Sequence, residues 1–467
     1  MSHHSSPKRY HDHQLEPAQL DAAGQKKTLS ALQRSIRKGI NFIEESDRMK
    51  GKNFSDRHDS LYTGESGISL MYLRIFLQAK ALDMPDKEIS YLAERVRLHM
   101  PRLSEHSPPA GRLSPIGGPT GPAVVEVLRQ LLLVDPNEDA DDLKDRWKTA
   151  MKTLKNATNN SLQTDVDQVD EILYGRAGLL WALLNFRRLV HDKVGDSGRL
   201  EDLHRICGSP IITGLVEDII RSGKDGARLY EEEFGEPGLS LMWEWHGKYY
   251  LGAIHGATGI LAILLQAPKS ILKPHIETIL QTIDQLRELV ESKNGFLPSS
   301  LPHRHKHHQL VQICHGAPGY LLLLSSLRTL HPEHWKDSFY PSSINKHIWE
   351  QGLLTKGLGL CHGISGNAYP WLLLSTLNQA GNEHDEQALA YGTAFIVHSE
   401  KCPPMFAKTP YEYRMPDHPL SLFEGLAGAM CAWSDACAAL HNQLEPKEQV
   451  PILGFPGIGG VGAIGML

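Results

Sequence analysis

This chain of 467 residues is short of the features that mark membrane-spanning, nucleic-acid-binding and disulfide-rich proteins. No stretch reaches the roughly 18 consecutive apolar residues of a membrane-spanning helix, so we expect no transmembrane segment, although peripheral membrane association stays open. The formal net charge is −6 without a basic stripe, which argues against a nucleic-acid partner. Cysteine is scarce, at 6 residues, and the first residues show no apolar signal segment. We therefore expect a cytoplasmic protein whose thiols are free.

Glycine, by contrast, is abundant and recurs in a pattern. Seven Gly-x-x-Gly pairs each open an apolar segment. The pairs are Gly64/Gly67, Gly118/Gly121, Gly175/Gly178, Gly256/Gly259, Gly316/Gly319, Gly363/Gly366 and Gly425/Gly428. More polar, amphipathic segments lie between the pairs, and the clearest is an apolar stripe from Ile276 to Val290. This alternation predicts buried inner helices sheathed by amphipathic outer ones.

Seven such units predict an all-α fold, an α/α toroid (barrel) of seven helix-pair repeats. Glycines at the inner-helix starts would allow close backbone approach and gather the helix N-termini at one end of the ring. The alternative is an open α-solenoid, in which glycines only stop helices. We expect a single domain at residues 25–451, after a flexible segment at 1–24 and before a Gly-rich apolar tail at 452–467. The tail would either tuck into the ring mouth or stay loose.

Reactive side chains concentrate directly before the glycine pairs. Two positions before the first glycine, the repeats carry apolar or aromatic residues except at Cys314 and Cys361. One position before it, three successive repeats carry His255, His315 and His362. Thiolates and imidazole suit a thiophilic metal. We therefore predict a Zn²⁺ site formed by Cys314, Cys361 and His362.

Three protein ligands leave the fourth position of a tetrahedral zinc open, as in catalytic sites. Two thiolates make the metal a weak Lewis acid that suits deprotonation of a substrate thiol. The chain lacks the His-Glu-x-x-His motif of metalloproteases. A rival donor set, four histidines within residues 303–308, recurs nowhere else and is typical of a solvated loop. The pattern favours thiol activation over hydrolysis.

Four segments carry a resemblance to a known family. They are residues 249–259 (YYLGAIHGATG), 314–319 (CHGAPG), 356–369 (KGLGLCHGISGNAY) and 422–428 (LFEGLAG). Through them the chain resembles the LanC-like (lanthionine synthetase C-like) proteins, relatives of bacterial lanthipeptide cyclases, and is most similar to the eukaryotic branch. The resemblance implies an α/α barrel with zinc on the residues that match Cys314, Cys361 and His362. Eukaryotic members are described as adding glutathione to dehydroamino acids in damaged proteins, whereas bacterial cyclases close thioether rings.

The resemblance also assigns roles around the metal. His255 would protonate the enolate left by thiol addition, and His315 would orient a ligand or take part in catalysis. An acidic residue of the bacterial cyclases falls at Glu171, beside Asp170. The positions that hold glutathione match Lys356, Arg414, Met415, Pro416 and Asp417. Bacterial cyclases carry an arginine where this chain has Leu310, which disfavours a lanthipeptide precursor as substrate.

The predicted function is zinc-dependent activation of a thiol, either glutathione or a peptide cysteine, for Michael-type addition to dehydroamino acids in peptides or proteins. The alternative is a non-catalytic protein with the same pocket, either a glutathione-binding signalling protein or an abscisic-acid-receptor-like one. A carbohydrate-processing toroid would require paired carboxylates, and only Glu424 and Glu65 stand near the glycine columns.

Overall fold

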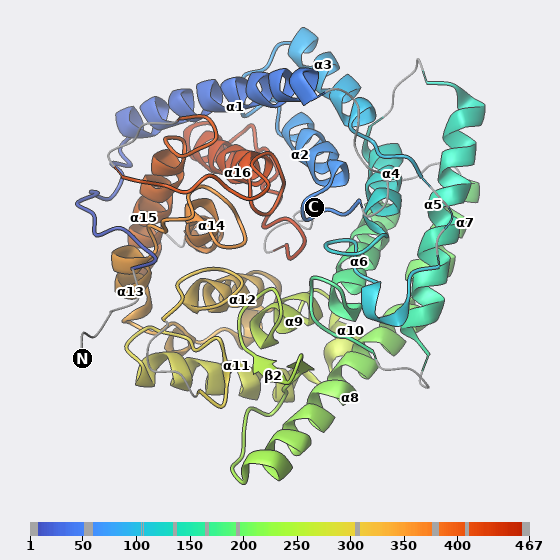
Figure 1. Cartoon of the computed structure of the whole chain (residues 1–467), viewed down its shortest axis with the longest axis vertical. Coiled ribbons are helices and arrows are strands. Elements are labelled where there is room, and N and C mark those ends of the chain that lie inside the picture. Colours follow the sequence, from blue (N-terminus) through green and yellow to red (C-terminus); the bar gives the residue numbers. More distant parts are fainter. Residues whose placement is uncertain are drawn as a thin grey trace.

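The computed structural model describes residues 8–50, 59–103, 105, 107–133, 138–163, 168–192, 197–303, 309–375, 383–406 and 411–459. These residues form helices arranged as two concentric rings (Figure 1). The inner helices are α2 (Glu65–Leu77), α4 (Gly121–Leu132), α6 (Arg176–Asp192), α9 (Ala257–Leu264), α12 (Ala317–Leu330), α14 (Ile364–Ser375) and α16 (Leu426–Leu444). Each inner helix packs against the next, and α16 packs against α2. The ring is therefore closed, which confirms the α/α toroid and excludes the open solenoid.

The outer ring is built from the amphipathic segments. Its helices are α1 (Ala22–Lys50), α3 (Asp86–Leu98), α5 (Ala140–Ser161), α7 (Ser197–Cys207), α8 (Ser209–Phe234), α11 (Ile276–Ser292), α13 (Ile344–Gln351) and α15 (Glu383–Ser399). On α11 the predicted stripe is confirmed, because Ile279, Ile283 and Val290 are buried. Every residue of the inner helix α14 is buried. The two burial patterns follow from the one-sided and the two-sided packing of the two rings.

Short elements fill the connections between the helices. They are α10 (Lys269–Leu272), three 3₁₀ turns (Ala110–Arg112, Pro332–His334 and Asp337–Phe339) and the strands β1 (Glu244–Trp245), β2 (Lys248–Tyr250) and β3 (Ser300–Leu301). The strands form an antiparallel sheet in the order β1-β2-β3, with Tyr249 paired to Leu301. None of the described helices has both the length and the apolar character needed to cross a bilayer.

Described residues near both chain ends make contacts that could not be predicted from the sequence. We expected residues 1–24 to be flexible; from residue 8 onward, the chain before α1 runs along residues 353–355 and is bonded there through its backbone. Residues 1–7 and 460–467 lie outside the described part. Of the tail, Phe455 and Ile458 are fully buried. Within its described residues, the tail occupies the ring interior.

The second glycine of each pair marks a close backbone approach. At Gly366, a Cβ atom would lie 1.8 Å from the carbonyl oxygen of Leu360, in the turn that precedes α14. The same clash with the carbonyl six residues earlier would occur at Gly259 and Gly428, also at 1.8 Å. No flexible side chain can yield there, because the obstacle is backbone. The turn before each inner helix therefore requires glycine at the second position of the pair.

We expect Gly366→Ala to lower the free energy of unfolding by about 1–3 kcal/mol or more, as overpacking does, because the turn that carries Cys361 must move. Gly111→Ala is the matched control, since the nearest atom to its Cβ would be Val169 Cγ2 at 3.8 Å. Thermal unfolding of both variants checks this. Equal midpoints for the two would show that the close approach does not constrain the turn.

Candidate metal centre

The turns before the inner helices are bonded to one another around the ring. The backbone N–H of Cys314 donates to the carbonyl oxygen of Cys361 at 3.1 Å. The N–H of Cys361 donates to the carbonyl oxygen of Phe423 at 2.8 Å. Phe423 N–H donates in turn to Tyr62 O at 3.2 Å. Similar bonds join Tyr62 N–H to Ile116 O, Gly117 N–H to Leu173 O, Ile172 N–H to Ile254 O and Ala253 N–H to Ile313 O. This belt of backbone bonds brings the residues before each glycine pair to one end of the toroid.

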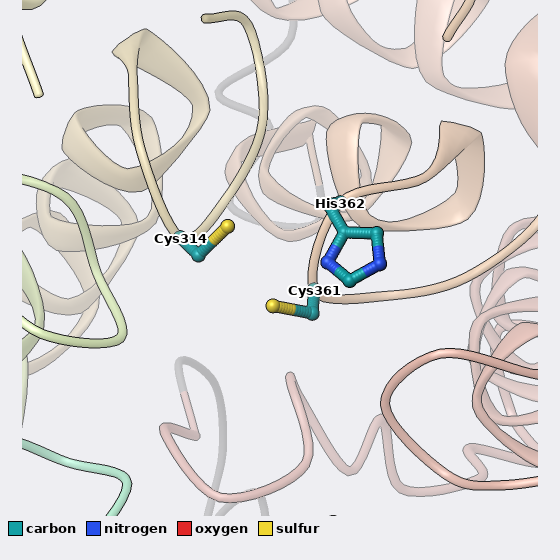
Figure 2. Close-up of side chains that lie close together, drawn as sticks. All are labelled: Cys314, Cys361 and His362. Atoms are coloured by element: carbon teal, nitrogen blue, oxygen red, sulfur yellow. The ribbon is translucent and has the colours of Figure 1, made fainter. Parts of the chain in front are cut away.

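Cys314, Cys361 and His362 converge in this belt. One ligand atom of each, two sulfurs and an imidazole nitrogen, lie within 4.8 Å of one another. Figure 2 shows the Cys361 sulfur pointing toward Cys314, with the His362 ring beside it. Both cysteines are buried. In the described part of the chain no fourth Cys, His, Asp or Glu joins the group. The donors fit zinc with one position left for an outside ligand.

Neighbouring groups favour negative charge on the Cys314 sulfur. The hydrogen bond between the two thiols lowers the pKa of Cys314 and raises the pKa of Cys361, so Cys314 is the first of the pair to ionise. Gln312 Nε2 donates to Cys314 Sγ at 3.1 Å. Burial opposes a charge on His362, but its hydrogen bond to Cys361 and the charge of that thiol outweigh burial and raise the pKa of His362.

A phenol also lies against the sulfur pair. Tyr62 stacks on Phe423 with 5.0 Å between ring centroids, and its hydroxyl lies beside Cys361. Burial and the neighbouring thiols raise the pKa of Tyr62, so the hydroxyl keeps its proton and can donate toward a thiolate. Tyr62 occupies the same column as the two cysteines, two positions before its glycine. That shared position was the signal in the sequence that we did not use.

His255 is paired with a carboxylate. Its Nδ1 lies 3.0 Å from Glu171 Oε2, and the same carboxylate accepts the backbone N–H of Leu173 at 2.8 Å. Asp170 is engaged elsewhere, by Arg176 Nε at 2.6 Å. The structure therefore places Glu171, rather than Asp170, against His255. When Nδ1 donates to this carboxylate, Nε2 is left as the proton-accepting atom.

His315 follows Cys314 in the chain, and its ring lies near those of His255 and Tyr250. Its ring centroid is 6.1 Å from that of His255 and 5.4 Å from that of Tyr250. Burial, followed by the charges of His255 and Lys248, lowers the pKa of His315 to about 4. Its Nδ1 is buried without a hydrogen-bond partner among the described residues. His315 is thus a neutral imidazole near pH 7.

A cavity of about 420 Å³ opens beside His362. Its wall includes two predicted binding residues, Lys356 and Arg414. Met415 and Asp417 are exposed next to Arg414, with Pro416 between them. Residues 8–10 also line the cavity, which the sequence did not indicate. Of the rival histidines at 303–308, only His303 is described, and it packs edge-on against Phe296.

A second carboxylate–imidazole pair was missed. Glu424, one position before Gly425, accepts or shares a proton with His418 Nδ1 at 2.7 Å, and its charge acts on Tyr62 and His362. Its position in the column was visible in the sequence. His418 carries no motif of its own, so only the fold reveals the pair.

Comparison with known proteins agrees with this architecture. Residues 55–441 match the family described as "Lanthionine synthetase C-like protein". The chain is 27% identical over 397 residues to "Glutathione S-transferase LANCL1" of Danio rerio, which covers 82% of this chain and 84% of the zebrafish protein. It is 29% identical over 278 residues to "LanC-like protein GCL1" of Arabidopsis thaliana, covering 60% of this chain and 57% of that protein.

Among solved structures, "Nisin cyclase" matches with a TM-score of 0.51 and 17% identity, covering 88% of this chain and 98% of the cyclase. This likeness supports the fold alone. The closed ring, the glycine-led inner helices and the family match over residues 55–441 together show that the chain belongs to the lanthionine synthetase C-like family.

Proposed function

We propose that this protein adds the thiol of glutathione, or of a related thiol, to dehydroamino acids in peptides or proteins, with zinc held by Cys314, Cys361 and His362. The observation that carries the proposal is the convergence of these three donors within 4.8 Å at the edge of a cavity lined by Lys356 and Arg414. The zebrafish relative that is named a glutathione S-transferase supports the choice of thiol.

The donor set decides which chemistry the centre suits. When bound, zinc would supply a positive charge that favours the thiolate form of a substrate thiol at neutral pH. Gln312 and Tyr62 place polar hydrogens against the sulfurs of Cys314 and Cys361. Such hydrogen bonds stabilise the thiolate form in which these cysteines would bind zinc. A substrate sulfur that bound beside these three donors would lie next to the cavity, because His362 belongs to both the ligand group and the cavity wall.

The cavity residues would hold and orient the thiol. Lys356 and Arg414 are exposed cations that can form charge-assisted hydrogen bonds with the carboxylates of glutathione. Fixing these carboxylates leaves the thiol as the group that reaches toward His362. Orientation of this kind converts a bimolecular encounter into a reaction between neighbouring groups.

His255 would complete the addition. The thiolate forms a C–S bond to the β-carbon of the dehydroamino acid, the C=C bond opens, and the α-carbon takes a proton. Glu171 fixes the imidazole through Nδ1, so His255 Nε2 can carry the proton that the thiol releases and return it to the α-carbon. A non-catalytic receptor would need the cavity but not this dyad. The dyad therefore favours catalysis.

We expect His255→Gln to reduce adduct formation by about 10²–10⁴-fold, the usual contribution of a general acid–base group, while glutathione binding is kept. Mass spectrometry of a dehydroalanine peptide incubated with glutathione and the metal-loaded protein measures the adduct. His204→Gln, at an exposed position on α7, is the control and should react like the wild type. Equal yields from wild type, His255→Gln and an enzyme-free sample would exclude the proposed reaction. Saturable glutathione binding without product would indicate a receptor instead.

A further inference from the structure

The N-terminal segment forms one wall of the cavity beside the metal centre. Thr355 N–H donates to the carbonyl oxygen of Arg9 at 3.0 Å, and the N–H of Arg414 donates to the carbonyl oxygen of Thr355 at 2.9 Å. Thr355 Oγ1 donates to the same Arg9 oxygen at 3.2 Å. Three segments far apart in the sequence thus lie side by side, centred on Thr355. They carry Arg9, Lys356 and Arg414, all of which line the cavity.

Further contacts fix the segment beyond Arg9. Tyr10 forms a β-bridge with Leu354, and His11 N–H donates to the carbonyl oxygen of Leu353 at 2.8 Å. His13 Nε2 lies 2.6 Å from the carbonyl oxygen of Trp349. The His11 ring packs against those of Tyr411 and Tyr413, with centroids 5.2 and 4.9 Å away. Arg9 is therefore held by paired backbone on a wall that faces the cavity.

The charged residues that line this cavity are all positive. Among the described residues that line it, four are cations, Lys8, Arg9, Lys356 and Arg414, and none is acidic. Lys8 is already paired with Asp12 at 2.6 Å. Among the described residues, no carboxylate lies within salt-bridge distance of Arg9, Lys356 or Arg414. Three cations without a protein counter-charge around one cavity make a site for a ligand with more than one negative charge.

The rest of the wall narrows the ligand class. Three side-chain amides, Gln309, Gln312 and Gln351, line the same cavity and suit the peptide groups of a short peptide. A volume of about 420 Å³ lies in the range of small-molecule pockets. His362 places the metal centre at the cavity wall. The ligand that matches all of these features is a short thiol peptide with carboxylates at separate positions.

We propose that Arg9 is a specificity-determining residue, and that the N-terminal segment gives the site its preference for thiol peptides bearing two or more carboxylates over uncharged thiols. This inference rests on the proposed function, because it concerns the thiol that the reaction uses. It adds an anchoring cation from outside the toroid's repeats, supplied by a segment that precedes α1. Thr355 positions that cation by bonding the Arg9 carbonyl.

Calorimetric titration of the full-length, zinc-loaded protein tests the inference. The probes are glutathione, S-methylglutathione, which has the same carboxylates but no free thiol, and 2-mercaptoethanol, which has a thiol but no carboxylate. We expect glutathione and S-methylglutathione to bind, and Arg9→Gln to weaken both by about tenfold or more, the effect of losing one charged hydrogen bond. Arg9→Lys should restore part of the affinity. The response to 2-mercaptoethanol should not change.

Lys27→Gln removes an exposed cation on α1, away from the cavity, and serves as the matched control with wild-type affinity. Unchanged binding of both glutathione compounds by Arg9→Gln would overturn the inference while leaving the proposed function intact. So would wild-type protein that binds glutathione but not S-methylglutathione, because recognition would then reside in the sulfur alone. If the wild type binds neither compound, the proposed use of glutathione fails as well.

Discussion

Cys361→Ser will remove stoichiometric zinc and reduce thiol addition to the level of an enzyme-free sample. Cys361 stands at the centre of the predicted ligand group: its carbonyl oxygen accepts the N–H of Cys314, and its side chain contacts Cys314, His362 and Tyr62. A serine hydroxyl does not ionise at neutral pH and is a poor ligand for a thiophilic metal. With only Cys314 and His362 left, the site falls to two protein ligands, fewer than catalytic zinc sites use.

Metal content per chain and adduct yield on a dehydroalanine peptide measure the two effects together. Cys207→Ser is the matched control. Cys207 is also buried, and burial raises its pKa to about 12, but its thiol only donates to the carbonyl oxygen of Leu203 at 3.0 Å. A serine hydroxyl can make the same bond, so this variant should keep its zinc and its activity. If Cys361→Ser retained one zinc and the wild-type yield, Cys361 could not be a ligand.

The outcome also separates metal loss from collapse of the fold. The belt of bonds around the metal centre uses the backbone of Cys361, not its sulfur, so the serine variant should keep the ring. Circular dichroism and the thermal midpoint should stay near the wild-type values, apart from any stabilisation that bound metal adds. A variant that unfolds outright would point to a structural role for the cysteine instead.

The ring was predictable because one steric rule repeats along the chain. Each second glycine leaves room for a carbonyl oxygen six residues earlier, as at Gly259 and Gly366, and this requirement is written locally in every repeat. The repeat with Pro115-Ile-Gly-Gly118 departs from the pattern, and there the helix α4 begins at Gly121, the second glycine of its pair. A steric requirement that is local to each repeat can be recognised from the sequence alone.

The convergence of the three candidate metal donors was predictable for a related reason. Cys314 and Cys361 occupy equivalent positions in adjacent repeats, and closure of the ring makes equivalent positions neighbours. Arg9 had no such signal, because its place in the cavity depends on a backbone pairing with Thr355, 346 positions away. The sheet of β1, β2 and β3 could not be predicted from the sequence either, because its strands are only two or three residues long. Long-range pairing of short segments leaves no periodic trace.

The position of the C-terminal tail was likewise not predictable, because it depends on contacts with residues far away in the sequence. Its glycine-rich, apolar composition left open whether it enters the ring or stays loose. Asp435, on α16, is fully buried and accepts the backbone N–H groups of Leu453 and Gly454 at 2.8 and 3.0 Å. The carbonyl oxygen of Gly454 accepts from Arg74 at 2.6 Å and from the Tyr369 hydroxyl at 2.9 Å. These partners come from three inner helices, so only the closed ring brings them together.

Asp435→Ala is expected to lower the free energy of unfolding by about 3–5 kcal/mol, the usual cost of removing one partner of a buried ion pair. Asp435 and Arg74 are both fully buried and lie 3.0 Å apart, and Gln78 Nε2 also donates to the carboxylate at 2.6 Å. Alanine would leave the Arg74 guanidinium without a counter-charge and two tail N–H groups without an acceptor. Thermal or urea unfolding measures the loss. Glu448→Ala breaks an exposed pair with Lys80 and should leave the midpoint nearly unchanged.

The double variant Arg74→Met/Asp435→Leu distinguishes charge from packing. Apolar side chains of similar size often replace a buried ion pair without loss of stability, but here the N–H groups of Leu453 and Gly454 would still lack their acceptor. The double variant should therefore be more stable than Asp435→Ala and less stable than the wild type. If it matched the wild type, the ion pair would be replaceable by packing and the tail's bonds to Asp435 would contribute nothing. If it were as unstable as Asp435→Ala, loss of the tail anchor, rather than the unpaired Arg74 charge, would account for the whole effect.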